Sequence, residues 1–215
     1  VGDFGAQGAV AVEARQRRLR GYHGFPGVGG RDAGDRPEGH HQFVFRAEGI
    51  DPCREAVRYG VERLGLDLRA SGITASPPGH LFDCITAWDV LEHLPEPLPW
   101  LQEVRARLAP GGTLILTTGD LDSRVARWSG RYWHLFNLPE HRYFYSRGTV
   151  IRLLERAGLP VKDIRYPPAY YDLGYLAERL GRKFLRYEPA SLRRFLSRWT
   201  VPLNLFDIME VTVGK

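Results

Sequence analysis

The chain has 215 residues, a formal net charge of +5 and a pI near 9.4, and 43% of its residues are hydrophobic. This length and composition indicate one globular domain with a sizeable core. No apolar run is long enough to span a bilayer and no secretory signal opens the chain, so we expect a cytoplasmic protein.

The two cysteines, Cys53 and Cys84, are too few for a disulfide scaffold and lack the spacing of metal ligands. They are consistent with a reducing compartment. The excess of basic residues permits contact with acidic surfaces, but it does not by itself indicate nucleic-acid binding.

Residues 1–45 form an atypical N-terminal segment. Residues 1–9 read as the tail of a strand and a glycine turn that lets the backbone approach a ligand, and residues 9–19 predict a helix. The Gly-, Arg- and Asp-rich residues 21–37 predict loop or disorder. This segment is either a genuine surface insertion or the product of a shifted reading frame. Its pair His40-His41 lacks a third ligand at suitable spacing, so we predict no metal site.

Regular elements begin at Phe43. Residues 43–50 predict a strand, residues 55–64 a helix ended by Gly65, and residues 66–70 a short strand. Asp51 follows the first of these strands, where a carboxylate can accept hydrogen bonds from both hydroxyls of a ribose. Alternatively Asp51 caps the following helix, and the two roles are compatible.

The central stretch is the run LFDCITAWDVLEHL, residues 81–94. Its first half predicts a buried strand that ends at Trp88-Asp89, and its second half predicts a helical segment that a proline-rich break interrupts. In open α/β sheets the carboxyl ends of the strands bind ligands. Alternatively Trp88 only packs and Asp89 only caps the next helix.

The remaining elements follow in order. We predict a helix over residues 100–108, a Pro-Gly-Gly turn, a strand over 113–118, a helix over 148–157 capped by Ser146, and strands over 161–166 and 202–213. Residues 170–200 form a basic helical insertion before the last strand. Such a stretch lies on anionic lipid, meets an acidic substrate or is a solvated outer face.

The pieces between Phe82 and Asp120 together resemble the class I S-adenosylmethionine-dependent methyltransferases, in particular the small bacterial branch with ubiquinone-type O-methyltransferases. In that family a strand ending near D-V-L-E-H precedes a helix and an L-x-P-G-G turn into the next strand. The likeness continues in P-E-H-x-x-x-[FY]-S at residues 139–146 and covers about residues 46–215, a methyltransferase-like domain. It implies a Rossmann-like, mostly parallel sheet with helices on both faces and an antiparallel last strand.

The resemblance also implies S-adenosylmethionine as the cofactor. Asp51 would hold its ribose, a small turn its adenine, and the end of the central strand its methionine part. A D-x-G-x-G-x-G turn is matched only in part near the N-terminus, with Gln7 and Ala9 where glycines are expected. The predicted cofactor-binding residues are Asp3, Gly5, Gly8, Asp51, Gly72, Ile73, Trp88 and Asp89.

In the resembled family, the segment after the fifth strand forms a wall of the substrate pocket. It supplies His134, Glu140 and Tyr143 as predicted pocket residues. His141, with an ordinary pKa of about 6.5, can take a proton from an acceptor hydroxyl or amine. His93 is the second catalytic candidate. Alternatively these histidines only pin the loop by hydrogen bonds.

The expected function is therefore methyl transfer to an oxygen, nitrogen or carbon of a small-molecule acceptor. One alternative is a degenerate protein that keeps the fold without binding cofactor. Another is a basic module that contacts an anionic membrane surface or nucleic acid. Nucleic acid is not the partner we expect, peripheral membrane contact stays open, and the sequence does not indicate an oligomeric state.

Overall fold

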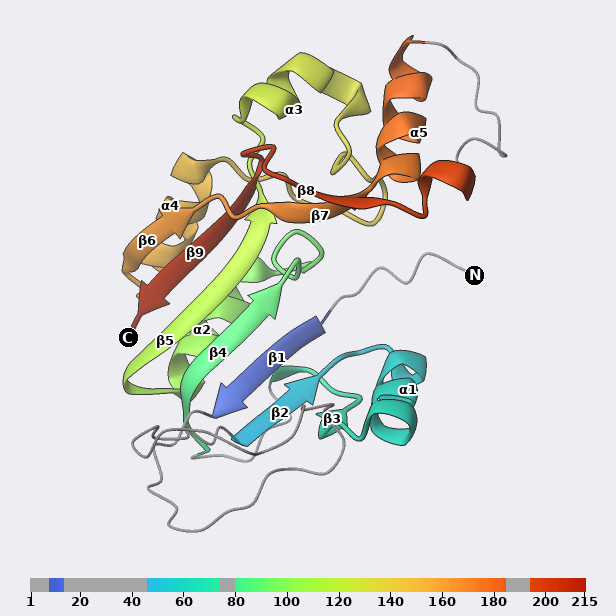
Figure 1. Ribbon diagram of the computed structural model, residues 1–215. Coiled ribbons are helices and arrows are strands. Elements are labelled where there is room, and N and C mark those ends of the chain that lie inside the picture. The colour runs from blue at the N-terminus through green and yellow to red at the C-terminus, as the bar shows by residue number, and fades with distance from the viewer. Residues whose placement is uncertain (1–7, 14–45, 74–79, 185–193) are drawn as a thin grey trace, which may run out of the picture.

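The computed structural model describes residues 8–13, 46–73, 80–184 and 194–215 (Figure 1). The predicted Asp3 and Gly5 of the glycine turn, His40-His41 and most of the N-terminal segment lie outside these ranges. Among the described residues, no helix combines the length and the hydrophobicity needed to cross a bilayer.

A seven-stranded sheet in the order β3-β2-β1-β4-β5-β9-β6 organises the chain. Strands β2, β3, β4, β5 and β6 run in one direction, while β1 and β9 run in the other. This confirms the α/β class with a mostly parallel sheet and an antiparallel last strand, which lies second from the edge. The strands are β1 Gly8–Glu13, β2 Arg46–Ile50, β3 Leu68–Arg69, β4 Phe82–Trp88, β5 Leu108–Gly119, β6 Val161–Arg165 and β9 Ile208–Gly214.

The adjacent strands β4 and β5 form the centre of the hydrophobic core. Their buried apolar residues either alternate with less buried ones or follow one another directly. Ile85 of β4 lies beside Leu114 of β5, and Leu114 lies beside Val213 of β9. All three side chains are fully buried. The predicted Pro-Gly-Gly turn is part of β5, at an irregularity where the pairing register with β4 shifts.

The prediction of a glycine turn followed by a helix is wrong for residues 8–13, the part of the N-terminal segment that the structure describes. Residues 9–13 belong to strand β1 and not to a helix, and Gly8 is the first residue of that strand and not part of a turn. The strand pairs with β2 on one side and β4 on the other, antiparallel to both. The gap between β2 and β4 requires a strand, because backbone groups of both neighbours would otherwise lack partners.

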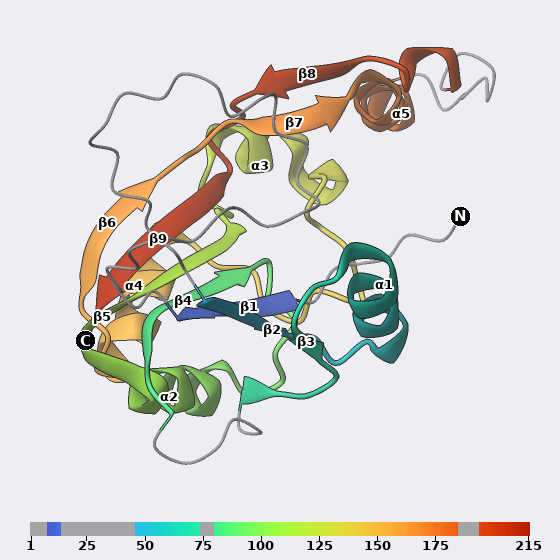
Figure 2. The ribbon, with the colours of Figure 1, turned by 60° about the horizontal axis from the view of Figure 1, so that its bottom comes forward.

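Helices α2 (Pro97–Arg107) and α4 (Arg147–Arg156) pack together on one face of the sheet (Figure 2). Residues 91–93 form a turn and not the predicted helical segment, because residues before proline avoid helical geometry and α2 begins only at Pro97. Ser146 caps α4 as predicted, in a reciprocal capping box with Thr149.

Helix α1 (Arg54–Leu64) follows β2 and packs beside β3. It ends as predicted at Gly65, whose φ of 66° is the left-handed conformation that glycine adopts without strain. The short β3 is thereby held between β2 and α1.

Further elements lie beyond the carboxyl ends of β4 and β5 (Figure 1). We call β7 (Ala169–Asp172), α5 (Leu173–Phe184) and β8 (Thr200–Leu203) the cap; its two strands pair antiparallel. Beside the cap lie α3 (Arg124–Ser129) and a short 3-10 helix (Gly130–Tyr132). The predicted single last strand is thus two strands, β8 and β9, separated by the irregular residues 204–207.

Leu114→Ala tests the assignment of the core to the β4–β5–β9 strands. Removing a fully buried leucine side chain leaves a cavity and should lower the free energy of unfolding by about 2–5 kcal/mol. The matched control Leu64→Ala, on the exposed end of α1, should change it by less than about 0.5 kcal/mol in urea denaturation. Equal losses in the two variants would contradict the assignment.

Candidate functional site

The site begins at the junction after β4. Asp89 has a φ of 50°, a left-handed conformation that aspartate tolerates better than most residues. Thr117 of β5 fixes it from the neighbouring strand: the Asp89 N–H donates to Thr117 Oγ1 at 3.0 Å, and that hydroxyl donates to Asp89 Oδ1 at 2.9 Å. The Asp89 side chain is exposed. The two hydrogen bonds to Thr117 therefore hold an accessible carboxylate at the ligand-binding edge of the sheet.

A cavity of about 290 Å³ lies at the carboxyl ends of β2, β3 and β4. Its walls are mostly apolar, as expected for a pocket that takes a flat ring system. The predicted adenine residues Gly72 and Ile73 both line it. The other lining residues are Ile50, Pro52, Ser71, Val90, His93, Leu94, Pro95 and Trp100.

The polar groups of this cavity suit a nucleoside. Asp51 lies between two lining residues, and its Oδ1 accepts from the N–H of Cys53 at 2.7 Å. The prediction that Asp51 caps the helix is wrong, because Cys53 is the N-cap residue of α1; Asp51 instead closes a turn just before the helix. The hydroxyl of Ser71 is buried without a hydrogen-bond partner among the described residues. A purine offers such a hydroxyl a partner, so the residues present fit the predicted cofactor.

Four hydrogen bonds dock residues 139–145 onto the turn after β4. The backbone oxygen of Glu92 accepts from the N–H groups of Arg142 and Tyr143 at 2.8 and 3.2 Å. The hydroxyls of Tyr143 and Tyr145 donate to the backbone oxygens of Pro95 and Leu91 at 3.0 and 3.3 Å. The P-E-H segment therefore lies against the end of β4, although the two are about fifty residues apart in sequence.

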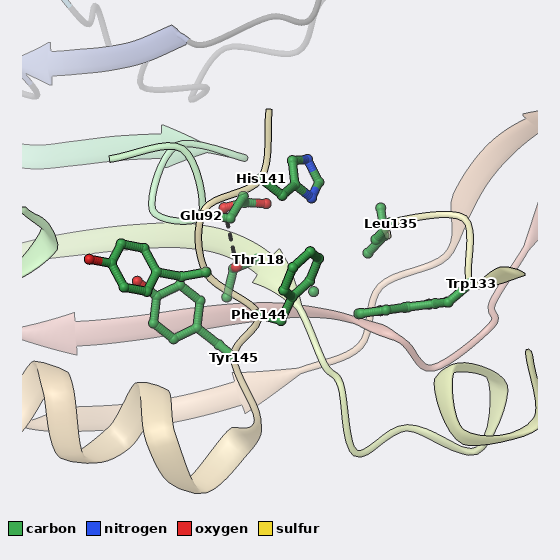
Figure 3. A pocket seen from close by; sticks show the side chains of 9 residues that line it. Glu92, Thr118, Trp133, Leu135, His141, Phe144 and Tyr145 are labelled. Carbon is green, nitrogen blue, oxygen red and sulfur yellow. Dashed lines mark hydrogen bonds between the residues drawn. The ribbon is translucent and has the colours of Figure 1, made fainter. Parts of the chain in front are cut away.

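This docking closes a second, narrow cavity of about 10 Å³, room for about one water molecule (Figure 3). Glu92, Thr118 and His141 form one side and Trp133 and Leu135 another. Gly119, Tyr143, Phe144 and Tyr145 complete the lining. A Cβ at Gly119 would lie 2.7 Å from Leu135 Cδ1 and 3.0 Å from the Trp133 ring, so a side chain there would displace this wall of the cavity. The cavity accepts only a small reacting group.

Glu92 is a buried acid whose charge is disfavoured. Burial is the main cause that raises its pKa to about 7, and the Asp89 carboxylate adds to the rise. Thr118 Oγ1 donates to Glu92 Oε2 at 3.1 Å, which opposes the shift and fixes the carboxyl group. Glu92 therefore titrates close to neutral pH.

His141 stands next to Glu92 in Figure 3 and is half-buried. Burial lowers its pKa, and the neighbouring His93 lowers it further. The two imidazole rings meet edge to face with centroids 4.6 Å apart. His141 is therefore neutral at pH 7 and able to accept a proton.

His93 joins the two cavities. It lines the larger one, while its neighbour Glu92 lines the smaller one. Its Nδ1 lies 3.0 Å from the backbone oxygen of Glu140. Ligand atoms of Glu92, His93 and His141 all lie within 4.8 Å of one another, a cluster of metal-ligating type. The sequence-based prediction of no metal site concerned the cysteines and His40-His41, and it did not consider these three residues together.

The other predicted residues lie at different distances from the cavities. Tyr143 lines the narrow cavity, while Glu140 is exposed beside it and bonds to Asn137. Trp88 is 42% exposed and lines neither cavity. His134 also lines neither, and its Nε2 lies 2.8 Å from Oδ2 of the buried Asp207. Gly8 pairs with Trp88 across β1 and β4, at the ligand-binding edge.

Sequence reasoning missed the buried polar residues of the site. Glu92, Thr118 and Asp207 are each nearly inaccessible. Asp207 accepts from Trp133 Nε1 at 2.9 Å and so fixes a wall of the narrow cavity from the start of β9. The sequence signal that could have marked Glu92 is its place in the D-V-L-E-H motif.

Comparison with known proteins also identifies a methyltransferase fold and family. The sequence model of the methyltransferase domain family matches residues 6–163. Ubiquinone biosynthesis O-methyltransferase of Aeromonas salmonicida is 27% identical over 175 residues, 77% of this chain and 66% of its own length. tRNA U34 carboxymethyltransferase of Pseudoalteromonas translucida is 32% identical over 144 residues, 59% of this chain and 43% of its own. The chain thus spans two thirds or less of these relatives.

Solved structures share the fold. The YcgJ protein of Bacillus subtilis superposes with a TM-score of 0.51 at 16% identity, covering 77% of this chain and 80% of that one. A methyltransferase of Thermotoga maritima, described as a possible histamine N-methyltransferase, gives 0.50 at 15% identity and covers 77% and 72%. At these identities the likeness concerns the fold alone.

The raised pKa of Glu92 predicts a pH-dependent stability. The folded protein holds the Glu92 proton up to about pH 7, whereas the unfolded chain releases it near the ordinary value of 4.5. The free energy of unfolding should therefore fall as pH rises between these values, by about 1–3 kcal/mol from this group. Glu92→Gln should remove this part of the decline.

Urea denaturation of both proteins at pH 5 and pH 8 measures the effect. Relative to the wild type, the glutamine variant should gain stability at pH 8 compared with pH 5. The same difference between the proteins at both pH values would show that Glu92 is not destabilised by ionisation.

Proposed function

The chain belongs to the class I S-adenosylmethionine-dependent methyltransferases, and from that premise we propose that it transfers a methyl group from S-adenosylmethionine to a small-molecule acceptor. The observation that carries the proposal is the arrangement of the two cavities on either side of Glu92-His93. One cavity fits a nucleoside, and the other admits a small reacting group beside a neutral histidine.

The larger cavity would take the adenosine part of the cofactor. Ile50, Ile73 and Trp100 supply apolar surface for the adenine, and Ser71 a hydroxyl. Asp51 at its rim would bind the ribose hydroxyls. Asp89, fixed by Thr117, would face the charged methionine part.

When bound, the cofactor supplies an activated sulfonium methyl group, so the chain has mainly to orient the acceptor and exclude water. Tyr143, Phe144 and Tyr145 with Trp133 wall the narrow cavity and keep bulk water out. His141 would accept a proton from the acceptor hydroxyl or amine, because its imidazole is neutral at pH 7.

The acceptor class is part of the proposal. The narrow cavity, together with the cap beyond the strand ends, suits a small molecule that presents one hydroxyl, amine or carbon (Figure 1). One relative acts on a tRNA and another in ubiquinone biosynthesis, by their names. We place this chain with the small-molecule enzymes. The cytoplasmic location expected from the sequence is part of the same proposal.

Calorimetric titration with S-adenosylhomocysteine tests the cofactor site. The chain should bind, and Asp51→Ala should weaken binding about 10- to 100-fold, since charge-assisted hydrogen bonds to the ribose would be lost. The control Asp67→Ala removes an exposed carboxylate from the loop before β3 and should leave the affinity unchanged. Failure of the folded wild-type chain to bind would favour a protein that retains the fold without its cofactor.

His141→Gln tests the proton transfer. With a panel of phenols, alcohols and amines, the release of S-adenosylhomocysteine should slow by about 10²- to 10⁴-fold, while cofactor affinity stays the same. His80→Gln, at the opposite end of β4, should be as active as the wild type. An unchanged rate in the His141 variant would limit this residue to holding the loop.

A further inference from the structure

We propose that Tyr171 of the cap is an acceptor-binding residue, whose hydroxyl donates a hydrogen bond to an oxygen atom of the acceptor. The inference rests on the proposed function, because it assigns a polar contact to the acceptor of that reaction. No sequence motif marks Tyr171, which lies in β7 and outside the seven-stranded sheet.

The backbone of β7 directs Tyr171 toward the sheet. Strands β7 and β8 pair with each other and lie across the carboxyl end of β5 (Figure 1). Neighbouring side chains of a strand point to opposite faces. Tyr170 is 77% exposed on the outer face of the cap, whereas Tyr171 is only 9% exposed on the other face. Tyr171 therefore faces inwards, at the edge of the sheet where ligands bind.

Two other rings hold the ring of Tyr171. It meets His134 edge to face with centroids 5.9 Å apart, and it stacks on Tyr175 at 6.4 Å. His134 follows directly after Trp133, which walls the narrow cavity, and Asp207 Oδ2 binds both residues. These contacts fix the phenol ring beside the wall of the narrow cavity without using its hydroxyl.

The Tyr171 hydroxyl has no hydrogen-bond partner within the described ranges. Other tyrosines of this region differ, since the hydroxyls of Tyr143, Tyr145 and Tyr166 each donate to an oxygen of the protein. Buried polar groups are almost always paired, so an unpaired hydroxyl on a nearly inaccessible side chain requires an explanation. A ligand bound between the cap and the strand ends would supply the missing partner.

The charges that act on Tyr171 connect it to the proposed reaction site. Burial raises its pKa to about 12, and the neighbouring Asp207, Tyr175 and Asp89 add to the rise. The same Asp89 carboxylate acts on the pKa of His141. Asp89 is thus within electrostatic range of both side chains, and an acceptor held beside it can meet His141 and Tyr171 together.

The chemistry of the hydroxyl selects the kind of acceptor. A phenol with this pKa keeps its proton at neutral pH and is available as a donor. Hydroxyl, ether and carbonyl oxygens have the lone pairs that such a donor needs, whereas the nitrogen of an aromatic amine accepts weakly. No covalent bond changes at Tyr171, and His141 remains the group that takes the proton of the reacting group. The hydrogen bond therefore orients the acceptor.

Tyr171→Phe removes only the hydroxyl and keeps the ring. The matched control Tyr170→Phe removes a hydroxyl from the outer face of the same strand. Two probes of the same shape, phenol and aniline, are titrated by ligand-detected nuclear magnetic resonance into the full chain saturated with S-adenosylhomocysteine. Tyr171→Phe should raise the Kd of phenol about 3- to 10-fold and that of aniline by less than about twofold. Tyr170→Phe should bind both probes as the wild type does.

Calorimetric titration of the same samples with S-adenosylhomocysteine, and their urea denaturation, separate this inference from the proposed function. Weaker phenol binding by Tyr171→Phe at unchanged cofactor affinity and stability supports the acceptor contact. Three results would overturn it and leave the proposed function standing: no phenol binding by the wild type, equal phenol affinity in wild type and Tyr171→Phe, or a loss of cofactor affinity in Tyr171→Phe. Failure of the wild-type chain to bind S-adenosylhomocysteine would overturn both.

Discussion

The candidate site depends on one short turn, residues 91–93, that is held in place from two sides. From below, Thr118 of β5 fixes the buried carboxyl group of Glu92. On the other side, the backbone oxygen of Glu92 accepts hydrogen bonds from two N–H groups of the segment that carries His141. Because side chain and backbone of Glu92 are both engaged, the turn cannot shift without breaking hydrogen bonds of a buried residue. The position of this turn therefore shapes both cavities, because its residues Glu92 and His93 line one cavity each.

The cap is joined to this arrangement through a second buried acid. Asp207 binds the indole of Trp133 and the ring of His134, and its backbone oxygen accepts from the N–H of Asp120 at the end of β5. The ring of His134 in turn meets Tyr171 of β7 edge to face. The position of the wall opposite Glu92 is thereby coupled to the start of β9 and to the cap. Segments more than seventy residues apart in sequence are thus joined by buried polar contacts.

Strand β1 runs antiparallel to both of its neighbours, β2 and β4, within a mostly parallel sheet. It places Gly8 beside Trp88 at the ligand-binding edge, at the start of the strand, and the carboxyl end of β1 at the opposite edge. The adenosine cavity does not depend on this strand, because its lining comes from residues 50–100. The part of the site that the sequence assigned to a glycine turn is the part in which the described structure departs from the family pattern. Cofactor binding would therefore rest mainly on the carboxyl ends of β2, β3 and β4.

The sequence by itself determined the strands that are continuously apolar, the helix ends marked by Gly65 and Ser146, and the residues at strand ends, since these follow from local periodicity and capping. It suggested Gly72 and Ile73 for the adenine and His141 for catalysis, and the structure places the first two at the larger cavity and His141 at the smaller one. Only the tertiary structure decided that residues 9–13 form a strand, because a neighbouring pair of strands overrides local helix preference. It also decided the roles of Glu92 and Asp207, whose burial and partners arise from contacts between segments far apart in sequence, and no local pattern records such contacts.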